Sequence, residues 1–161
     1  MGTSAAGWIG GSFPEGATVT RTSEAEWRGP LADGDGSVKL GSGAFEGRYS
    51  FNSRFQDGPG TNPEELLGAA HAACFSMALS LVLGDAGFTP RRITTSAAVE
   101  IERSGDGFSI PRIRLTTNVD VPGIDLRAFT AHAEAAKRGC PVSKALAGVE
   151  ISLDAQLADR D

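Results

Sequence analysis

The chain has 161 residues and a mass of 16.7 kDa, which is the usual size of a single domain. Apolar residues make up 40% and charged residues 22%, a balance typical of a globular protein and not of a disordered one. The net charge of −5 gives no electrostatic support for a nucleic-acid partner or an anionic membrane. The apolar stretch 69–84 is shorter than the roughly 20 residues that cross a bilayer, so no membrane partner is expected.

The two cysteines, Cys74 and Cys140, are too few for a disulfide scaffold and form no CxxC motif. Nothing in the sequence indicates export, so we expect a cytoplasmic protein. In that reducing compartment, lone cysteines are either inert core thiols or redox-active residues. Residues 1–17 are rich in Gly, Ala and Ser and are predicted to form a flexible tail, whereas residues 18–161 are predicted to form one domain.

The first predicted elements are strands. Residues 19–27 alternate, residues 34–36 form a turn, and Val38 and Leu40 lie on the strand that returns from it. Residues 48–55 place aromatic side chains on one face and polar ones on the other, which predicts a third strand.

A long helix is predicted next. Asn62 is a favoured N-cap, Pro63 suits the first turn, and the two acidic residues that follow suit the positive helix end. The pattern runs to about Ala86 and stops at Gly87. Its residues are apolar almost all round, which predicts a helix buried at the centre of the fold.

The next predicted elements are two strands joined by a hairpin. Residues 93–101 alternate, and residues 104–107 form the hairpin loop. The returning strand, 108–121, changes phase at Pro111, where a bulge or an edge is expected.

Two helices and a strand complete the chain. Asp125 is expected to cap a helix that ends near Arg138, with Gly139 as its C-cap. A short helix is expected over 140–147 and a last strand over 149–157. This order of elements predicts an α+β domain.

The two cysteines have different local settings. Cys140 precedes a helix-starting proline, so its thiol lies at a helix N-terminus, where the backbone dipole favours a thiolate. On this ground alone, Cys140 is the candidate nucleophile. Cys74 lies in mid-helix and needs a nearby cation for a low pKa. The alternatives remain open: Cys74 is a small buried hydrophobe, and Cys140 an ordinary cap residue.

His71 lies three residues before Cys74 and shares its helical face. A Cys–His nucleophile would also need an orienting group and an oxyanion hole, which the sequence does not supply. The alternative is that His71 is a polar residue whose hydrogen bonds are satisfied at a packing interface. A zinc site formed by His71, Cys74, His132 and Cys140 is a further alternative, although the spacings match no zinc ribbon or finger.

Two stretches carry a resemblance to a known family. They are GTNPEELLGAAHAACFSMAL at 60–79 and GCPVSKAL at 139–146, and residues 51–55 and 121–125 fit as well. Over residues 18–158 the chain resembles the OsmC branch of the OsmC/Ohr family, the osmotically inducible and organic-hydroperoxide-resistance proteins. The resemblance implies an intertwined homodimer with antiparallel sheets wrapped around long central helices, and no metal or flavin.

The resemblance also implies a thiol peroxidase that reduces organic hydroperoxides in stress defence. It makes Cys74 the peroxidatic cysteine and Cys140 the resolving one, against the local dipole argument. Arg54 is implied as the catalytic arginine and Glu64 as the acid that positions it; taken alone, they are a surface arginine and a helix-start acid. The electron donor is expected to be a dithiol, notably a protein-bound lipoyl group. Two alternatives are a non-catalytic stress protein that binds a small apolar ligand at the dimer interface and a zinc-binding module.

The distance between two of these residues implies a shared site. Glu64 and Cys74 are ten positions apart, which is about 15 Å along a continuous helix. They meet only if a second copy of the helix runs antiparallel, with the two-fold axis near Ala69. The alternatives are a helix break between them, or a small-residue patch at 68–73 that faces the protein's own sheet.

Overall fold

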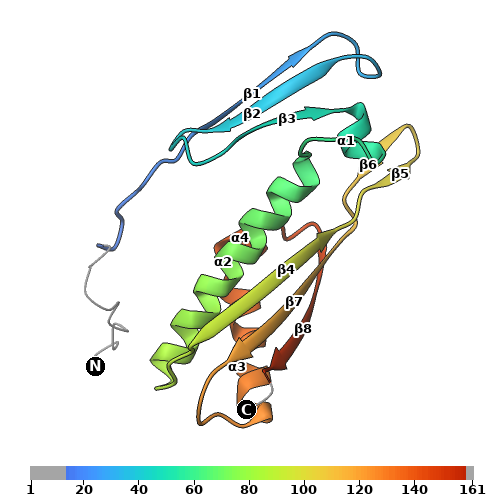
Figure 1. The fold of residues 1–161 in the computed structure, drawn as a ribbon. Coiled ribbons are helices and arrows are strands. Elements are labelled where there is room, and N and C mark those ends of the chain that lie inside the picture. The colour runs from blue at the N-terminus through green and yellow to red at the C-terminus, as the bar shows by residue number, and fades with distance from the viewer. Residues whose placement is uncertain (1–13, 159–161) are drawn as a thin grey trace. The chain divides into compact units, whose positions relative to one another are not determined.

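The structure is a computed structural model that describes residues 14–158 (Figure 1). The expectations for residues 1–13, most of the predicted tail, and for 159–161 lie outside the described residues. The chain divides into two compact units, one ending at Thr61 and one beginning at Asn62, and each is described by itself. A single domain over 18–161 therefore stays a prediction.

The first unit contains a three-stranded antiparallel sheet. Its strands are β1 (Ser23–Arg28), β2 (Asp35–Leu40) and β3 (Glu46–Ser50), in that order. Gly36 pairs with Tyr49 across the sheet, and a Cβ atom on Gly36 would lie 2.6 Å from the tyrosine ring. The tyrosine side chain therefore occupies the space that a larger residue on β2 would need.

The strand predicted over 48–55 is wrong in its second half, because the chain turns at Ser50 into helix α1 (Phe51–Phe55). The Ser50 hydroxyl accepts from the Ser53 N–H, and the Ser53 hydroxyl accepts from the Ser50 N–H, which forms a capping box. Phe51 and Phe55 share a face in a strand and also in a helix, where their ring centroids lie 4.9 Å apart. The alternation of side chains therefore could not distinguish the two structures.

The second unit is built on a three-stranded sheet of order β4-β7-β8. β4 (Arg92–Val99) and β7 (Arg112–Asp120) are antiparallel, whereas β8 (Glu150–Leu157) runs parallel to β7. The chain between β7 and β8 forms α3 (Leu126–Gly139) and α4 (Pro141–Ala145). This helical crossover returns the chain to the starting end of β7. The expectation of antiparallel sheets therefore needs correction at the last strand.

A small hairpin interrupts the long strands predicted on either side of it. β5 (Glu102–Ser104) and β6 (Gly107–Ser109) pair around Gly105, whose φ is +58°, which confirms the predicted hairpin loop. The phase change at Pro111 coincides with the break between β6 and β7. Proline has no N–H to donate to a ladder, which explains the break.

Helix α2 (Pro63–Asp85) confirms the predicted long helix and its caps. The Asn62 side chain accepts a hydrogen bond from the Glu65 N–H at 2.8 Å. Beyond the other end, Gly87 adopts a φ of +85°, which favours glycine.

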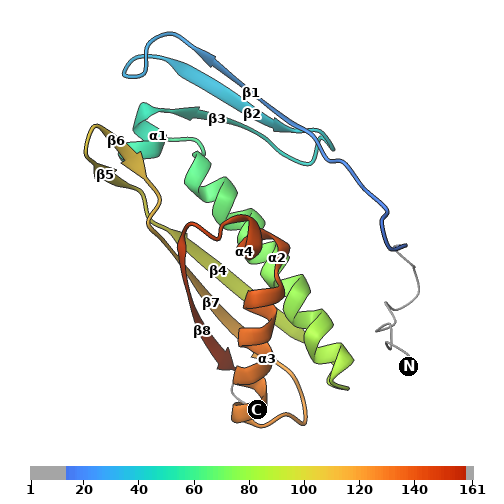
Figure 2. The same cartoon turned by 180° about the vertical axis from the view of Figure 1, so that it is seen from behind.

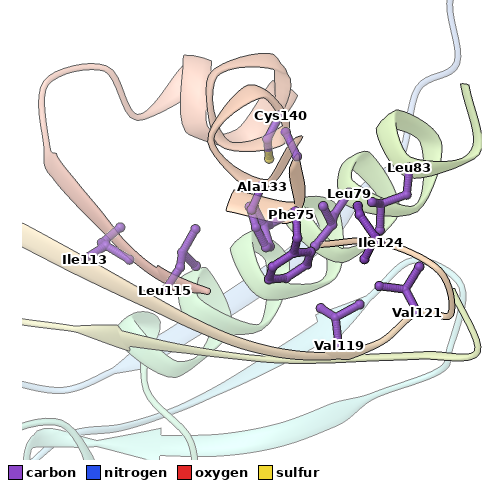
Figure 3. Close-up of a cluster of buried hydrophobic side chains, with 12 residues drawn as sticks. Phe75, Leu79, Leu83, Ile113, Leu115, Val119, Val121, Ile124, Ala133 and Cys140 are labelled. Carbon is purple, nitrogen blue, oxygen red and sulfur yellow. The ribbon is translucent and has the colours of Figure 1, made fainter. Parts of the chain in front are cut away.

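The core of the second unit lies between the sheet and two helices. α2 and α3 cover the same face of the sheet, as the two views show (Figures 1 and 2). Figure 3 shows side chains from the helices and from β7 meeting there. The fully buried members of this cluster are Phe75, Leu79, Leu83, Ile113, Leu115, Val119, Phe129, Ala133, Ala136 and Cys140.

The junction of α3 and α4 differs from the prediction. Asp125 caps α3 as expected, by accepting from the Ala128 N–H at 2.9 Å. Gly139, however, is the last helical residue, and Cys140 is both the C-cap of α3 and the N-cap of α4. Cys140 has a ψ of 121°, the extended value that a following proline imposes, so Pro141 ends the helix and no left-handed glycine is needed.

By length and composition, α2 could also cross a membrane, because its uncharged part begins already at Leu66. One such helix is weak support for a membrane span, since the core helix of a soluble protein passes the same test. α2 buries Phe75, Leu79 and Leu83 in the cluster of Figure 3, as a core helix does.

Candidate functional site

The structure brings the two cysteines together within the second unit. Cys74 lies in the middle of α2, and Cys140 lies at the junction of α3 and α4, which both contact α2. Both thiols are free, and they lie close enough for each to shift the pKa of the other. The pair can therefore form a disulfide through a local adjustment.

The two thiols differ in their access to solvent. Cys140 is completely buried, and its side chain belongs to the core cluster shown in Figure 3. Cys74 is only half-buried. A dissolved reactant can therefore reach Cys74, whereas Cys140 is positioned to react with Cys74 itself.

Cys140 has the more stable thiolate. Burial opposes its ionisation, but the donor groups near the sulfur, which are the Ser143 N–H and hydroxyl, the Cys74 thiol and the Val142 N–H, outweigh it and lower the pKa of Cys140. The backbone donors are free N–H groups in the first turn of α4. The direction of this shift is the one that the helix N-terminus argument predicted from the sequence.

Cys74 is shifted in the opposite direction. Burial raises the pKa of Cys74, and so does the neighbouring Cys140, while the Val142 N–H opposes them. A thiolate at Cys74 therefore needs further stabilisation, as the mid-helix position indicated.

A buried polar pair lies behind Cys140. His71 of α2 is fully buried, and its Nε2 lies 2.8 Å from the Ser143 hydroxyl oxygen. Nδ1 of His71 has no hydrogen-bond partner in the part of the chain that the structure describes. Burial lowers the pKa of His71, so the ring is neutral at pH 7. The prediction of a satisfied polar residue is thus correct for one ring nitrogen only.

Ser143 was missed by sequence reasoning. It is the third residue after Cys140 and lies in the first turn of α4, a position from which a side chain can reach back to the cap residue. That spacing in GCPVS was the available signal. Nothing in the sequence indicated the partner of Ser143, because His71 is 72 positions away.

Glu64 and Arg54 belong to different units. Glu64 lies in the first turn of α2 and is almost completely buried, with 7% of its surface exposed. α2 is continuous, which excludes a break between Glu64 and Cys74, so they are about 15 Å apart along the axis. Arg54 lies in α1 of the first unit, with its guanidinium 5.2 Å from the Phe55 ring centre. The association of Arg54 with Glu64 and Cys74 stays a prediction.

One face of α2 consists of small and apolar residues that nothing in the described chain covers. Ala69, Ala70 and Ala73 are exposed along it, and Met77 is 73% exposed. Of the patch at 68–73, Gly68 does approach the sheet, since its Cβ would lie 3.2 Å from the Ala97 carbonyl oxygen. The patch is therefore divided between the sheet and an uncovered face.

The zinc alternative finds no geometric support. Within residues 14–158, no three His, Cys, Asp or Glu side chains are grouped so that they could hold a metal ion. His132 instead packs against Phe88, with ring centroids 6.2 Å apart.

The chain resembles known proteins in sequence and in structure. The family model described as OsmC-like protein matches residues 56–154. The peroxiredoxin OsmC of Escherichia coli (strain K12) is 51% identical over 141 residues, which cover 87% of this chain and 98% of that protein. An organic hydroperoxide resistance protein of Xanthomonas axonopodis pv. citri is 33% identical over 60% of this chain and 67% of its own length.

A solved structure supports the same assignment. The organic hydroperoxide resistance protein of Elizabethkingia anophelis has a TM-score of 0.69 and 28% identity, and the match covers 88% of this chain and all of that one. The family model covers more than half of the chain, and the relative from E. coli aligns over nearly its whole length. This chain therefore belongs to the OsmC/Ohr family.

Proposed function

We propose that this protein is a peroxiredoxin-type oxidoreductase that reduces organic hydroperoxides to alcohols in oxidative or osmotic stress defence. The observation that carries the proposal is the pair of neighbouring thiols, one half-buried and one completely buried. The names of the relatives, peroxiredoxin OsmC and organic hydroperoxide resistance protein, support the same reaction class.

The reaction has two chemical steps in the protein. The Cys74 thiolate attacks the distal peroxide oxygen, the O–O bond breaks, the alcohol leaves with a proton, and a sulfenic acid remains on Cys74. The Cys140 thiolate then attacks that sulfur, so that an S–S bond forms, the S–O bond breaks and water leaves. An external dithiol reduces the disulfide by exchange.

Exposure and pKa favour different cysteines as the nucleophile, and the proposal gives more weight to exposure. Cys140 has the lowered pKa, but it is completely buried, so a hydroperoxide cannot reach its sulfur without local opening. Cys74 is only half-buried, which makes it the thiol that a reactant can approach. The lowered pKa of Cys140 suits the second step, in which its thiolate attacks a neighbour, and disulfide reduction, in which it is a good leaving group.

Arg54 supplies the cation that Cys74 requires in this proposal. Burial and Cys140 raise the pKa of Cys74, so a guanidinium beside the sulfur would restore the thiolate and hydrogen-bond the peroxide oxygens. Glu64 holds that guanidinium by a bidentate pair.

The working unit is a homodimer in which two copies of α2 run antiparallel. The exposed residues Ala69, Ala70 and Ala73 support this arrangement, because small side chains allow two helices to approach closely. With the two-fold axis near Ala69, Glu64 of one chain lies level with Cys74 of the other. Each site then takes residues from both chains.

The partners outside the dimer follow from the chemistry. The electron donor is a dithiol, notably a lipoyl group carried by a protein, in the reducing cytoplasm. The substrate is a bulky organic hydroperoxide, because each methylene of its tail that is buried on apolar walls adds about 0.8 kcal/mol of binding free energy.

Substitution of each cysteine tests the assignment of the nucleophile. Cys74→Ser should abolish peroxide consumption, down to the level of the Cys74→Ser/Cys140→Ser double variant. Cys140→Ser should consume one equivalent of cumene hydroperoxide and retain a sulfenic acid on Cys74, which dimedone labelling and mass spectrometry detect. A first turnover in Cys74→Ser, and none in Cys140→Ser, would reverse the assignment.

Substitution of Arg54 tests the proposed activation of Cys74. Arg54→Ala should slow the first step by about 100-fold, the usual effect of removing one transition-state donor, and should raise the pKa of Cys74. Arg54→Lys keeps the charge but loses the planar fork. Compared with Arg54→Ala, it should bring the pKa of Cys74 back toward the wild-type value but recover less of the rate of the first step. The measurement is the alkylation rate of Cys74 against pH in the Cys140→Ser background. An alkylation profile unchanged in Arg54→Ala would count against this role.

Subunit complementation tests the shared site. Cys74→Ser and Glu64→Ala chains are each inactive, but a heterodimer would contain one site with Cys74 from one chain and Glu64 from the other. After random exchange, half of the dimers are mixed and each has one intact site of two, so about a quarter of wild-type activity should return. A mixture that stays inactive after mass spectrometry has shown exchange would rule out this geometry.

A further inference from the structure

The buried pair of His71 and Ser143 is not used by the mechanism described so far. His71 Nε2 lies 2.8 Å from the Ser143 hydroxyl oxygen, and Ser143 is the third residue after Cys140, in the first turn of α4, where its hydroxyl helps to lower the pKa of the Cys140 thiol. His71 comes from α2 and the other two residues from the α3–α4 junction. The three side chains therefore form a row within the second unit, in which His71 contacts Ser143 and Ser143 neighbours Cys140.

The number of hydrogens that His71 and Ser143 can donate determines which group is the donor at each contact in the row. A neutral histidine has one N–H, and a hydroxyl has one hydrogen to donate. If Nε2 carries the hydrogen, His71 donates to Ser143 and the Ser143 hydroxyl donates to the Cys140 sulfur. Only Nδ1, an acceptor, then remains without a partner among the described residues.

The other tautomer satisfies fewer groups. If Nδ1 carries the hydrogen, the Ser143 hydroxyl must donate to His71, so the Cys140 sulfur loses that donor. A buried N–H at Nδ1 would also lack a partner in the described part of the chain, which is unfavourable because a buried donor without an acceptor loses its hydrogen bonds to water. The Nε2–H tautomer is therefore the stable one.

We propose that His71 is a positioning residue for the resolving step: its Nε2–H holds the Ser143 hydroxyl directed at the Cys140 sulfur and so favours the attacking thiolate. This inference rests on the proposed peroxidase function. The Cys140 thiolate displaces oxygen from the Cys74 sulfenic acid, which is reduced as Cys140 is oxidised. The hydroxide that leaves takes up the proton released by Cys140 and becomes water, so no further reactant is needed.

His71 acts as a donor and not as a base. Burial lowers the pKa of His71, which makes it a weak proton acceptor. Protonation would also give Nδ1 a buried hydrogen without a partner among the described residues. A glutamine can present an amide N–H near the position of Nε2, whereas a leucine of similar size cannot, so these two variants separate donation from simple packing.

The experiment separates the two chemical steps in single-turnover, quenched-flow measurements with one equivalent of cumene hydroperoxide at neutral pH. Dimedone labelling follows the Cys74 sulfenic acid, and intact mass follows the disulfide. Loss of a hydrogen bond to a charged sulfur raises its pKa by about 1–2 units, and the more basic thiolate regains part of the lost rate. Ser143→Ala and His71→Leu should therefore slow disulfide formation by about 3- to 10-fold and leave sulfenic acid formation within about twofold.

Two comparisons make the test specific. His71→Gln should keep most of the wild-type rate of disulfide formation. In the Ser143→Ala background, His71→Leu should not slow disulfide formation further, because His71 acts through Ser143. Additive effects, a glutamine variant as slow as the leucine variant, or equal slowing of both steps would overturn the role of His71. The Ser143→Ala variant keeps the test valid if His71→Leu fails to fold.

A measurement without peroxide distinguishes failure of this inference from failure of the proposed function. In the Cys74→Ser background, thiolate absorbance near 240 nm reports the pKa of Cys140. Ser143→Ala and His71→Leu should raise that pKa by about one unit or more, and His71→Gln should not. An unchanged pKa overturns the inference, whether or not the protein reduces peroxide. If the variants raise the pKa of Cys140 but the protein forms no sulfenic acid, the result supports the role of His71 and Ser143 and rejects the proposed peroxidase function.

Discussion

The packing of α2 against α3 and α4 is the contact on which the rest of the site depends. It places a mid-helix thiol, Cys74, beside the cap residue Cys140. The approach is fixed along one buried face of α2, on which Phe75 and Leu79 pack in the core and Gly68 allows close contact with β4. A slip of α2 by one turn, about 5.4 Å, would separate the sulfurs beyond disulfide reach.

This packing gives the two cysteines complementary properties. The end of α3 and the start of α4 supply donors that favour the Cys140 thiolate, and the same junction buries it completely. Cys74 remains reachable but has a raised pKa, so its activation must come from a cation. A single chain can therefore bury Cys140 and still leave the Cys74 thiolate dependent on a further group, a role that the proposal assigns to Arg54.

Local chemistry explains which elements could be predicted. α2 was predictable from Asn62 and Gly87, and the thiolate-favouring site at Cys140 from the proline that follows it. The α1 helix was not, because Phe51 and Phe55 fit a strand face and a helix face equally well. The parallel pairing of β8 and the His71–Ser143 contact depend on the tertiary crossover, which leaves no periodic signal. The roles of the two cysteines came from the family resemblance.

The central claim is that Cys74 and Cys140 of one chain form a single redox unit. Intact mass spectrometry of the wild-type protein, after one equivalent of cumene hydroperoxide without reductant, tests it most directly. The account predicts a loss of two hydrogens per chain, reversed by a dithiol, with peptide mapping that assigns an intrachain Cys74–Cys140 disulfide. An unchanged mass, stable addition of oxygen without loss of hydrogen, or a disulfide between chains would contradict it.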